Sequence, residues 1–254
     1  MTNCSSNRGE PVDKIAGRNQ VMEALKAGRK ISRLLISEGS RPKEVIDEAR
    51  RKGIPFEYVD RRRLDTLVRE THQGVVALAS PVEYARVEDL LQAARSQQEP
   101  ALIVALDGVE DPHNLGSVIR SVDVLGAHGV LIPERRAAGL STAVSRASAG
   151  AVEHVKVARV VNLARAIDNM KQEGLWAIGL DGSADKMLWQ VDFTVPTLLV
   201  VGGEGKGLGR LIGQKCDITA RIPMSGRVTS LNASVAAALA LYEVRRQRMN
   251  LLIR

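Results

Sequence analysis

The chain alternates between two hydrophobic patterns along most of its length. Short apolar runs predict strands, whereas stretches with apolar positions three or four residues apart predict amphipathic helices. In the first third these patterns predict a small α/β unit that covers residues 14–80. Its expected helices are 18–28, 42–52 and 61–70, and its expected strands are 33–37, 55–58 and 74–79.

A second alternation begins after Pro100. Several of its apolar runs are continuous, which is typical of strands buried on both faces of a parallel sheet. The pattern therefore predicts an α/β domain of about six strands over residues 101–254. The expected strands are 101–106, 129–132, 153–160, 176–180, 197–202 and 218–222, and the expected helices are 115–125, 142–149, 162–173, 208–215 and 231–248.

Two segments interrupt these patterns. Residues 1–13 are polar and are predicted to form a disordered tail. Residues 81–100 run from Pro81 to a polar Ser-Gln-Gln-Glu-Pro stretch and are predicted to be a linker, with a helix at 87–95.

The net charge of +7 favours a polyanionic partner. Most of the excess lies at the front, because residues 1–86 hold 17 Lys and Arg against 12 Asp and Glu, while residues 87–254 hold 19 against 17. This basic region is either a solvated surface or a nucleic-acid footprint. The seven aromatic residues are scattered, which argues against a sheet that stacks bases.

Composition also excludes several classes of protein. No apolar run approaches the roughly 20 residues that span a bilayer, and the start of the chain has no secretory signal pattern. Two cysteines, Cys4 and Cys216, form neither a disulfide framework nor a metal set. We therefore expect a cytoplasmic protein without a metal and without a membrane partner.

Three polar segments follow predicted strands, where open α/β sheets bind ligands. The first, 106–129, contains Asn114, a candidate helix cap, and Arg120, which falls off the apolar stripe of its helix. The second, 198–210, is rich in glycine but matches neither the phosphate-binding nor the dinucleotide-binding fingerprint. Its Glu204 would repel phosphate and suits a ligand with positive charge or hydroxyl groups.

The third segment, 221–248, is a polar loop followed by an alanine-rich helix. Its polar residues exceed what one helix cap requires. One face of the helix carries larger apolar residues, and the pattern is typical of a buried helix. The polar set is Ser225, Arg227, Thr229, Ser230, Asn232 and Ser234, and the apolar face is Leu231, Val235, Leu239 and Tyr242.

Together and in this order, the three segments resemble the SpoU family of the SPOUT superclass, the S-adenosylmethionine-dependent RNA 2'-O-ribose methyltransferases. The matching motifs are Asn114-Leu115-Gly116 through Arg120, Val201 to Leu208, and Ile222-Pro223-Met224 through Ser230 to Ser234. The flanking segments, among them 145–167, resemble a bacterial subgroup that methylates a guanosine of 23S rRNA.

The resemblance implies features that the pattern of residues could not supply. The C-terminal domain should hold a deep trefoil knot and a parallel sheet, the N-terminal domain should be L30e-like and bind RNA, and the protein should be a homodimer. S-adenosylmethionine should be the cofactor, held at Gly202, Gly203, Ile222, Met224, Leu231 and Asn232. The catalytic positions should be Arg120, Asn114, Glu204, Ser230 and Asn232.

Two questions stay open at this point. The family mechanism makes Arg120 the proton acceptor, but a guanidinium is a very poor base and could instead bind a substrate phosphate. The substrate could be 23S rRNA, a tRNA, or an rRNA adenosine in antibiotic resistance. Two other classes are a non-catalytic ribosome-assembly protein on the same scaffold and a nucleotide-dependent oxidoreductase, which the missing dinucleotide fingerprint disfavours.

Overall fold

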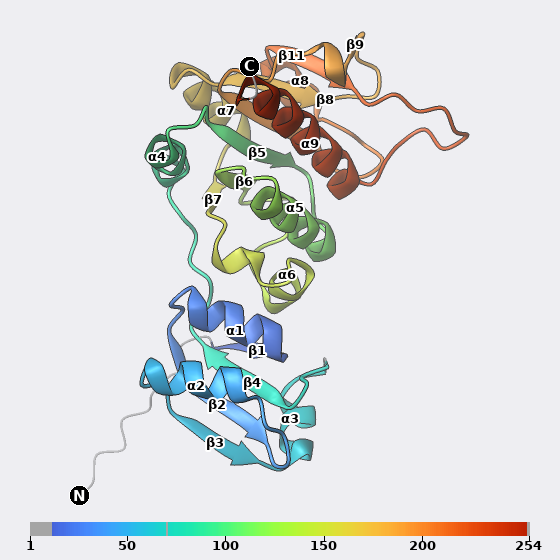
Figure 1. Cartoon of the computed structure of the whole chain (residues 1–254). Coiled ribbons are helices and arrows are strands. Elements are labelled where there is room, and N and C mark those ends of the chain that lie inside the picture. Colours follow the sequence, from blue (N-terminus) through green and yellow to red (C-terminus); the bar gives the residue numbers. More distant parts are fainter. Residues whose placement is uncertain (1–11, 70, 253–254) are drawn as a thin grey trace, which may run out of the picture. The chain divides into compact units, whose positions relative to one another are not determined.

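The computed structural model describes residues 12–69 and 71–252. Its chain divides into two compact units, Met1–Glu83 and Tyr84–Arg254. Figure 1 shows both units as mixtures of helices and strands, as the sequence predicts.

The first unit is built on a four-stranded sheet of order β1-β4-β2-β3, in which β4 runs antiparallel to both neighbours and β2 runs parallel to β3. Helices α1 and α2 cover one face, where Val21, Leu34 and Val45 are buried, and α3 covers the other through Leu64. The elements are β1 Asp13–Ala16, α1 Arg18–Lys26, β2 Ile31–Ser37, α2 Lys43–Arg51, β3 Phe56–Val59, α3 Arg61–Leu67 and β4 Val75–Ala79.

Strand β1 was not predicted from the sequence. Its run of four residues is too short and too polar to stand out, and it forms because its backbone pairs with β4. Arg29 also forms an ion pair with Asp13, which the sequence analysis placed in the tail. The remainder of the predicted tail, residues 1–11, lies outside the described residues.

The second unit is built on a parallel sheet of order β7-β6-β5-β10-β8-β11-β9. Its strands are β5 Leu102–Asp107, β6 Gly129–Pro133, β7 Val157–Val160, β8 Trp176–Leu180, β9 Lys186–Met187, β10 Thr197–Gly202 and β11 Ile218–Arg221. Its helices are α4 Val87–Gln97, α5 Pro112–Val124, α6 Thr142–Ala147, α7 Leu163–Gln172, α8 Arg210–Lys215 and α9 Ala233–Leu252, with short 3-10 turns at Ala151–Glu153 and Leu188–Gln190.

Helices cover both faces of this sheet (Figure 1). Helices α4, α7 and α8 pack over one face, and α5, α6 and α9 lie together on the other. The central strands are buried on both faces, which explains their continuous apolar runs. The α/β class and the parallel sheet are confirmed, while the trefoil knot stays a prediction.

Two boundaries differ from those expected. Residues 84–100 are not a linker but part of the second unit, because Leu90 and Leu91 of α4 are buried in its core. The predicted strand 153–160 begins only at Val157, after a 3-10 turn.

Helix α9 does not bury the face that carries its larger apolar residues in the pattern. Its small residues Ala237 and Ala240 are buried against the unit, whereas Val235, Leu239 and Tyr242 are 45%, 44% and 61% exposed. Helix α9 packs on α5 and β10, and close packing of two helix backbones favours alanine at the contact over larger side chains.

The end of α9 is fixed by a buried arginine. The guanidinium of Arg248 donates hydrogen bonds to the carbonyl oxygens of Pro100, Ala101, Phe193 and Val195, at 2.6–3.2 Å. Burial lowers its pKa to about 10. These four bonds tie α9 to the segments that enter β5 and β10. Across the part of the chain that the structure describes, no helix is both long enough and apolar enough to cross a membrane.

Candidate active site

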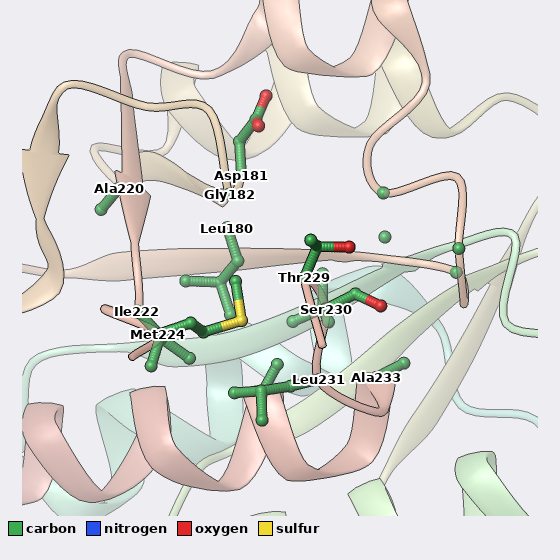
Figure 2. Close-up of a pocket in the computed structure, with 16 residues that line it drawn as sticks. Leu180, Asp181, Gly182, Ala220, Ile222, Met224, Thr229, Ser230, Leu231 and Ala233 are labelled. Carbon is green, nitrogen blue, oxygen red and sulfur yellow. The ribbon is translucent and has the colours of Figure 1, made fainter. Parts of the chain in front are cut away.

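A pocket lies where the carboxyl ends of β8, β10 and β11 meet. It is bounded by the turn after β8, the glycine-rich turn after β10, and the loop that leads from β11 into α9. Figure 2 shows these side chains around the pocket, with the Asp181 carboxyl group pointing away from Met224. The lining residues are Leu180, Asp181, Gly182, Val201, Gly202, Gly203, Gly205, Gly207, Ala220, Ile222, Met224, Thr229, Ser230, Leu231, Ala233 and Ala236.

The glycine-rich turn folds back on itself so tightly that two of its positions exclude a side chain. A Cβ on Gly202 would lie 2.1 Å from the carbonyl carbon of Gly207, and one on Gly203 would lie 2.2 Å from the carbonyl oxygen of Gly108. Asp107 holds both ends of the turn, since its carbonyl accepts from Gly203 N at 2.7 Å and its carboxylate accepts from Gly209 N at 2.8 Å.

Three polar side chains, one from each motif, meet beside this turn. Asn114 Nδ2 donates to Glu204 Oε1 at 2.9 Å, and Asn232 Nδ2 donates to Asn114 Oδ1 at 2.9 Å. Asn232 also hydrogen-bonds to Glu204. We call Asn114, Glu204 and Asn232 the polar triad; it connects the start of α5, the glycine-rich turn and the start of α9.

Asn232 has a second role in the local fold. Its Oδ1 accepts from the backbone N–H and the hydroxyl of Ser234, at 2.9 and 2.6 Å, at the start of α9. The amide oxygen therefore caps the helix, while the amide nitrogen serves the triad. One side chain thus both caps α9 and joins the triad.

Position 116 of the first motif requires glycine for a steric reason. A Cβ on Gly116 would lie 2.4 Å from the Cβ of Ala147 and 2.9 Å from the backbone nitrogen of Ser148. Helix α5 therefore lies directly against α6, and this close contact fixes the helix that carries Asn114.

Two of the predicted catalytic residues, Ser230 and Arg120, are not part of the polar triad. Ser230 lines the pocket but is not hydrogen-bonded to the triad. Arg120 is exposed on α5, six residues after Asn114, and does not line the pocket. Among the described residues, its side chain has neither a hydrogen bond nor an ion pair.

Five of the six predicted cofactor residues, Gly202, Gly203, Ile222, Met224 and Leu231, line the pocket, whereas Asn232 reaches it through the triad. The turn after β8, including Asp181, also lines the pocket but was not among the predicted site residues. Asp181 directly follows the predicted strand 176–180, so the rule that ligands bind at the carboxyl ends of strands could have identified it.

Among the described residues, no histidine or thiol lines the pocket. His128 lies at the other end of β5, where its Nδ1 accepts from Leu102 N at 3.0 Å, and burial lowers its pKa. Burial also raises the pKa of Cys216 to about 11, so this thiol stays protonated at neutral pH. Within the described ranges, no group of three His, Cys, Asp or Glu side chains could hold a metal ion. Cys4 lies outside them.

Comparison with known proteins agrees with this geometry. The SpoU rRNA Methylase family matches residues 101–242, and a family described as RNA 2'-O ribose methyltransferase substrate binding matches residues 14–85. The TrmH family tRNA/rRNA methyltransferase YacO of Bacillus subtilis (strain 168) is 49% identical over 93% of this chain and 96% of its own.

Two solved structures are similar over nearly the whole chain. The SpoU methyltransferase AviRb from Streptomyces viridochromogenes, in complex with AdoMet, has a TM-score of 0.82 and 28% identity over 98% of this chain and 96% of its own. An AdoMet-bound rRNA methyltransferase from Sinorhizobium meliloti has a TM-score of 0.77 and 28% identity, over 92% and 87%.

The fold and the site therefore define an RNA-modifying enzyme of the SPOUT type. The chain belongs to the SpoU rRNA methylase family. The expected class, an RNA 2'-O-methyltransferase that uses S-adenosylmethionine, is confirmed at the level of the family.

Proposed function

We propose that this enzyme methylates the ribose 2'-hydroxyl of a guanosine in 23S rRNA. The observation that carries the proposal is the polar triad beside the glycine-rich pocket, because it brings all three motifs of the family to one place. The choice of 23S rRNA rests on the flanking segments of the sequence and on a matched substrate-binding unit over residues 14–85. An rRNA substrate also implies that the protein works in the cytoplasm.

The pocket fits S-adenosylmethionine, which supplies an electrophilic methyl group on a sulfonium. Its walls combine apolar side chains, Ile222, Met224 and Leu231, with the exposed backbone of Gly202 and Gly203. Apolar walls suit an adenine ring, and backbone groups can recognise its edge. The carboxylate of Glu204 lies nearby. Its negative charge is compatible with a cationic ligand, whereas it would repel a phosphate.

The triad positions the reacting groups. Two amide groups donate to one oxygen of Glu204, which fixes the carboxylate and leaves its second oxygen to accept from a ribose hydroxyl. Ser230 lines the pocket and can donate to the ligand. Because the reaction requires oxygen, methyl and sulfur in line, such fixed groups contribute mainly by orientation.

Arg120 contacts the RNA rather than the cofactor in this proposal. It does not line the pocket and has no partner among the described residues, so its guanidinium is available to a phosphate or to charge that develops at the target ribose. A free guanidinium is a very poor base, which favours this role over that of proton acceptor.

The proposed enzyme is a homodimer. Helix α9 exposes an apolar face formed by Val235, Leu239 and Tyr242, although its opposite face is fully packed. Such a face on a soluble enzyme is suited to a second copy of the chain. Leu239→Glu should convert the protein to a monomer in analytical ultracentrifugation, and an unchanged sedimentation coefficient would place the dimer contact elsewhere.

The decisive experiment maps ribose methylation in total RNA from cells with and without this protein. A single guanosine of 23S rRNA should lose its 2'-O-methyl group when the protein is absent and regain it with purified enzyme and S-adenosylmethionine. Loss of a tRNA methyl group instead would reassign the substrate, and no change in any RNA would support a non-catalytic role.

A further inference from the structure

The loop between β6 and α6, residues 134–141, is held in one conformation by the surrounding unit. Glu134 N donates to the carbonyl of Val160 at 2.8 Å, and Ala138 N donates to the carbonyl of Val109 at 2.9 Å. At its far end, Leu140 N donates to the hydroxyl of Tyr84 at 2.9 Å. Backbone groups therefore fix its beginning, its middle and its end.

A further pair of side chains reinforces this arrangement. The guanidinium of Arg159 lies 5.4 Å from the ring centroid of Tyr84, a cation–π contact, and also donates to the carbonyl of Glu134 at 3.3 Å. Tyr84 and Arg159 thus hold the two ends of the loop together. We call residues 134–141 the arginine loop, since they include Arg135 and Arg136.

The two arginines face solvent without a partner. Both are exposed, and neither has a hydrogen bond or an ion pair among the residues that the structure describes. Arg136 also has a φ of +58°, a left-handed conformation that L-residues other than glycine adopt at a cost of about 1–2 kcal/mol. Such strain persists only where the surroundings impose it, and it often marks a functional position.

The charges of this unit are distributed unevenly. Near the amino ends of the strands, Arg95 is ion-paired with Glu173 at 3.0 Å and Lys215 with Asp168 at 2.7 Å. In contrast, the loops at the carboxyl ends of the strands carry cations that have no acidic partner among the described residues. These are Arg135 and Arg136 after β6, Lys206 after β10 and Arg227 after β11.

The arginine loop lies next to the first motif. The bond from Ala138 to Val109 joins it to the segment just before α5, and α6, which follows the loop, packs against Gly116 of α5. The loop therefore lies beside the helix that carries Asn114 and Arg120.

We propose that the arginine loop binds backbone phosphates of the RNA strand next to the target nucleotide. The inference rests on the proposed function and deepens it, because it assigns a phosphate contact that sets where the ribose lies relative to the triad. Two unpaired guanidinium groups on a fixed loop suit phosphate oxygens, which accept paired hydrogen bonds. A loop that is already ordered binds without the entropic cost of ordering it.

The test compares two double variants of the full-length protein, each of which loses two positive charges. Arg135→Ala/Arg136→Ala should bind an unmodified 23S rRNA transcript on the order of tenfold more weakly, and the slope of log affinity against log salt should fall by about 1.4–1.8. The matched control, Arg95→Ala/Lys215→Ala, removes exposed ion pairs at the other edge and should leave both quantities near wild type.

Two further measurements separate the outcomes. S-adenosylmethionine affinity, measured by calorimetry, should be unchanged in both variants because the loop does not line the pocket. Arg135→Lys/Arg136→Lys should keep most of the salt dependence while recovering only part of the affinity, since an ammonium lacks the planar fork. RNA affinity and salt slope equal to wild type in the alanine variant would overturn the proposal, as would an equal loss in the control.

An error in the assignment of the arginine loop can be distinguished from an error in the proposed function. If the wild-type enzyme methylates the transcript and the alanine variant methylates it equally well, only the loop assignment is wrong. If the wild-type enzyme methylates no 23S rRNA, the substrate assignment is wrong as well.

Discussion

Asn232 Nδ2 lies 2.9 Å from Asn114 Oδ1, although 118 residues of chain separate them. The first residue caps the start of α9 and the second lies in the first turn of α5, so their contact depends on the packing of α9 against α5. Because Asn232 also caps α9, changes at this position can separate folding from chemistry.

Asn232→Asp should fold normally but react poorly. A carboxylate still accepts from Ser234 and therefore preserves the cap, so the free energy of unfolding should change by less than about 1 kcal/mol. It cannot donate to Asn114, and it places a second negative charge beside Glu204. We expect single-turnover methyl transfer to fall on the order of 10²-fold. Asn232→Ala is the comparison, since it should lose both stability and transfer. A wild-type rate in Asn232→Asp would remove the triad from the mechanism.

The tight turn after β10 gives a second prediction. Gly203→Ala should destabilise the protein by about 1–3 kcal/mol and abolish S-adenosylmethionine binding, because its Cβ would overlap the carbonyl of Gly108 and displace the turn. The control is Gly213→Ala in α8, where nothing lies within 4 Å of the added Cβ. That change should be neutral or stabilise by up to about 1 kcal/mol. Calorimetry with S-adenosylmethionine checks both, and full binding by Gly203→Ala would contradict the assigned pocket.

The sequence singled out three residues that the structure brings together, but it did not predict how they are packed. Strand ends and motif order located Asn114, Glu204 and Asn232, because ligands gather at the carboxyl edge of a parallel sheet. The sequence could not show that Asn232 would form a hydrogen bond with Asn114. Nor could it show that Arg120 would lie outside the pocket, since both depend on how helices distant in the chain pack.

The failures have specific physical causes. The hydrophobic pattern of α9 favoured burial of Leu239, but the helix packs on α5 and β10 and buries Ala240 and Leu241 instead. Arg248 lies at the end of the expected helix 231–248, and four carbonyl groups that only the tertiary structure brings together hold it in the interior. Strand β1 needed a partner strand that lies far along the chain.

Buried His128 makes stability depend on pH. Burial lowers its pKa in the folded state, so between that value and about 6.5 the unfolded chain binds more protons than the folded one. Stability should therefore be constant above about pH 6.5 and fall as the pH decreases below it, by at most about 1.4 kcal/mol per pH unit from this group. His128→Asn keeps an acceptor for Leu102 N and should reduce this slope. Urea unfolding from pH 5 to 8 measures it, and identical slopes in the two proteins would exclude His128 as the cause.

We expect the second unit to bind S-adenosylmethionine and the first unit to contribute to RNA binding. Tyr84–Arg254 contains the whole pocket and its own core, so deletion of residues 1–83 should leave S-adenosylmethionine affinity within about twofold of wild type. RNA affinity and its salt dependence should both fall, since the deleted part carries most of the excess positive charge. Filter binding with 23S rRNA checks this. An rRNA affinity unchanged by the deletion would show that the first unit does not bind the substrate.

The last prediction concerns Arg120, the predicted catalytic residue that the structure leaves outside the triad. Because Arg120 is exposed and has no partner among the described residues, Arg120→Ala should change the free energy of unfolding by no more than about 0.5 kcal/mol. S-adenosylmethionine binding should persist, since Arg120 does not line the pocket. Methyl transfer should nevertheless collapse, because the guanidinium faces the RNA in the proposed mechanism.

Arg120→Lys should recover little of that transfer, because a single ammonium cannot reproduce the planar fork that binds a phosphate. Arg95→Ala is the matched control, an exposed arginine at the opposite edge whose loss should leave transfer unchanged. A single-turnover assay on rRNA transcripts, with saturating enzyme, separates loss of chemistry from weak RNA binding. Transfer near the wild-type rate by Arg120→Ala would leave Glu204, Ser230 and Asn232 as the groups that act on the ribose.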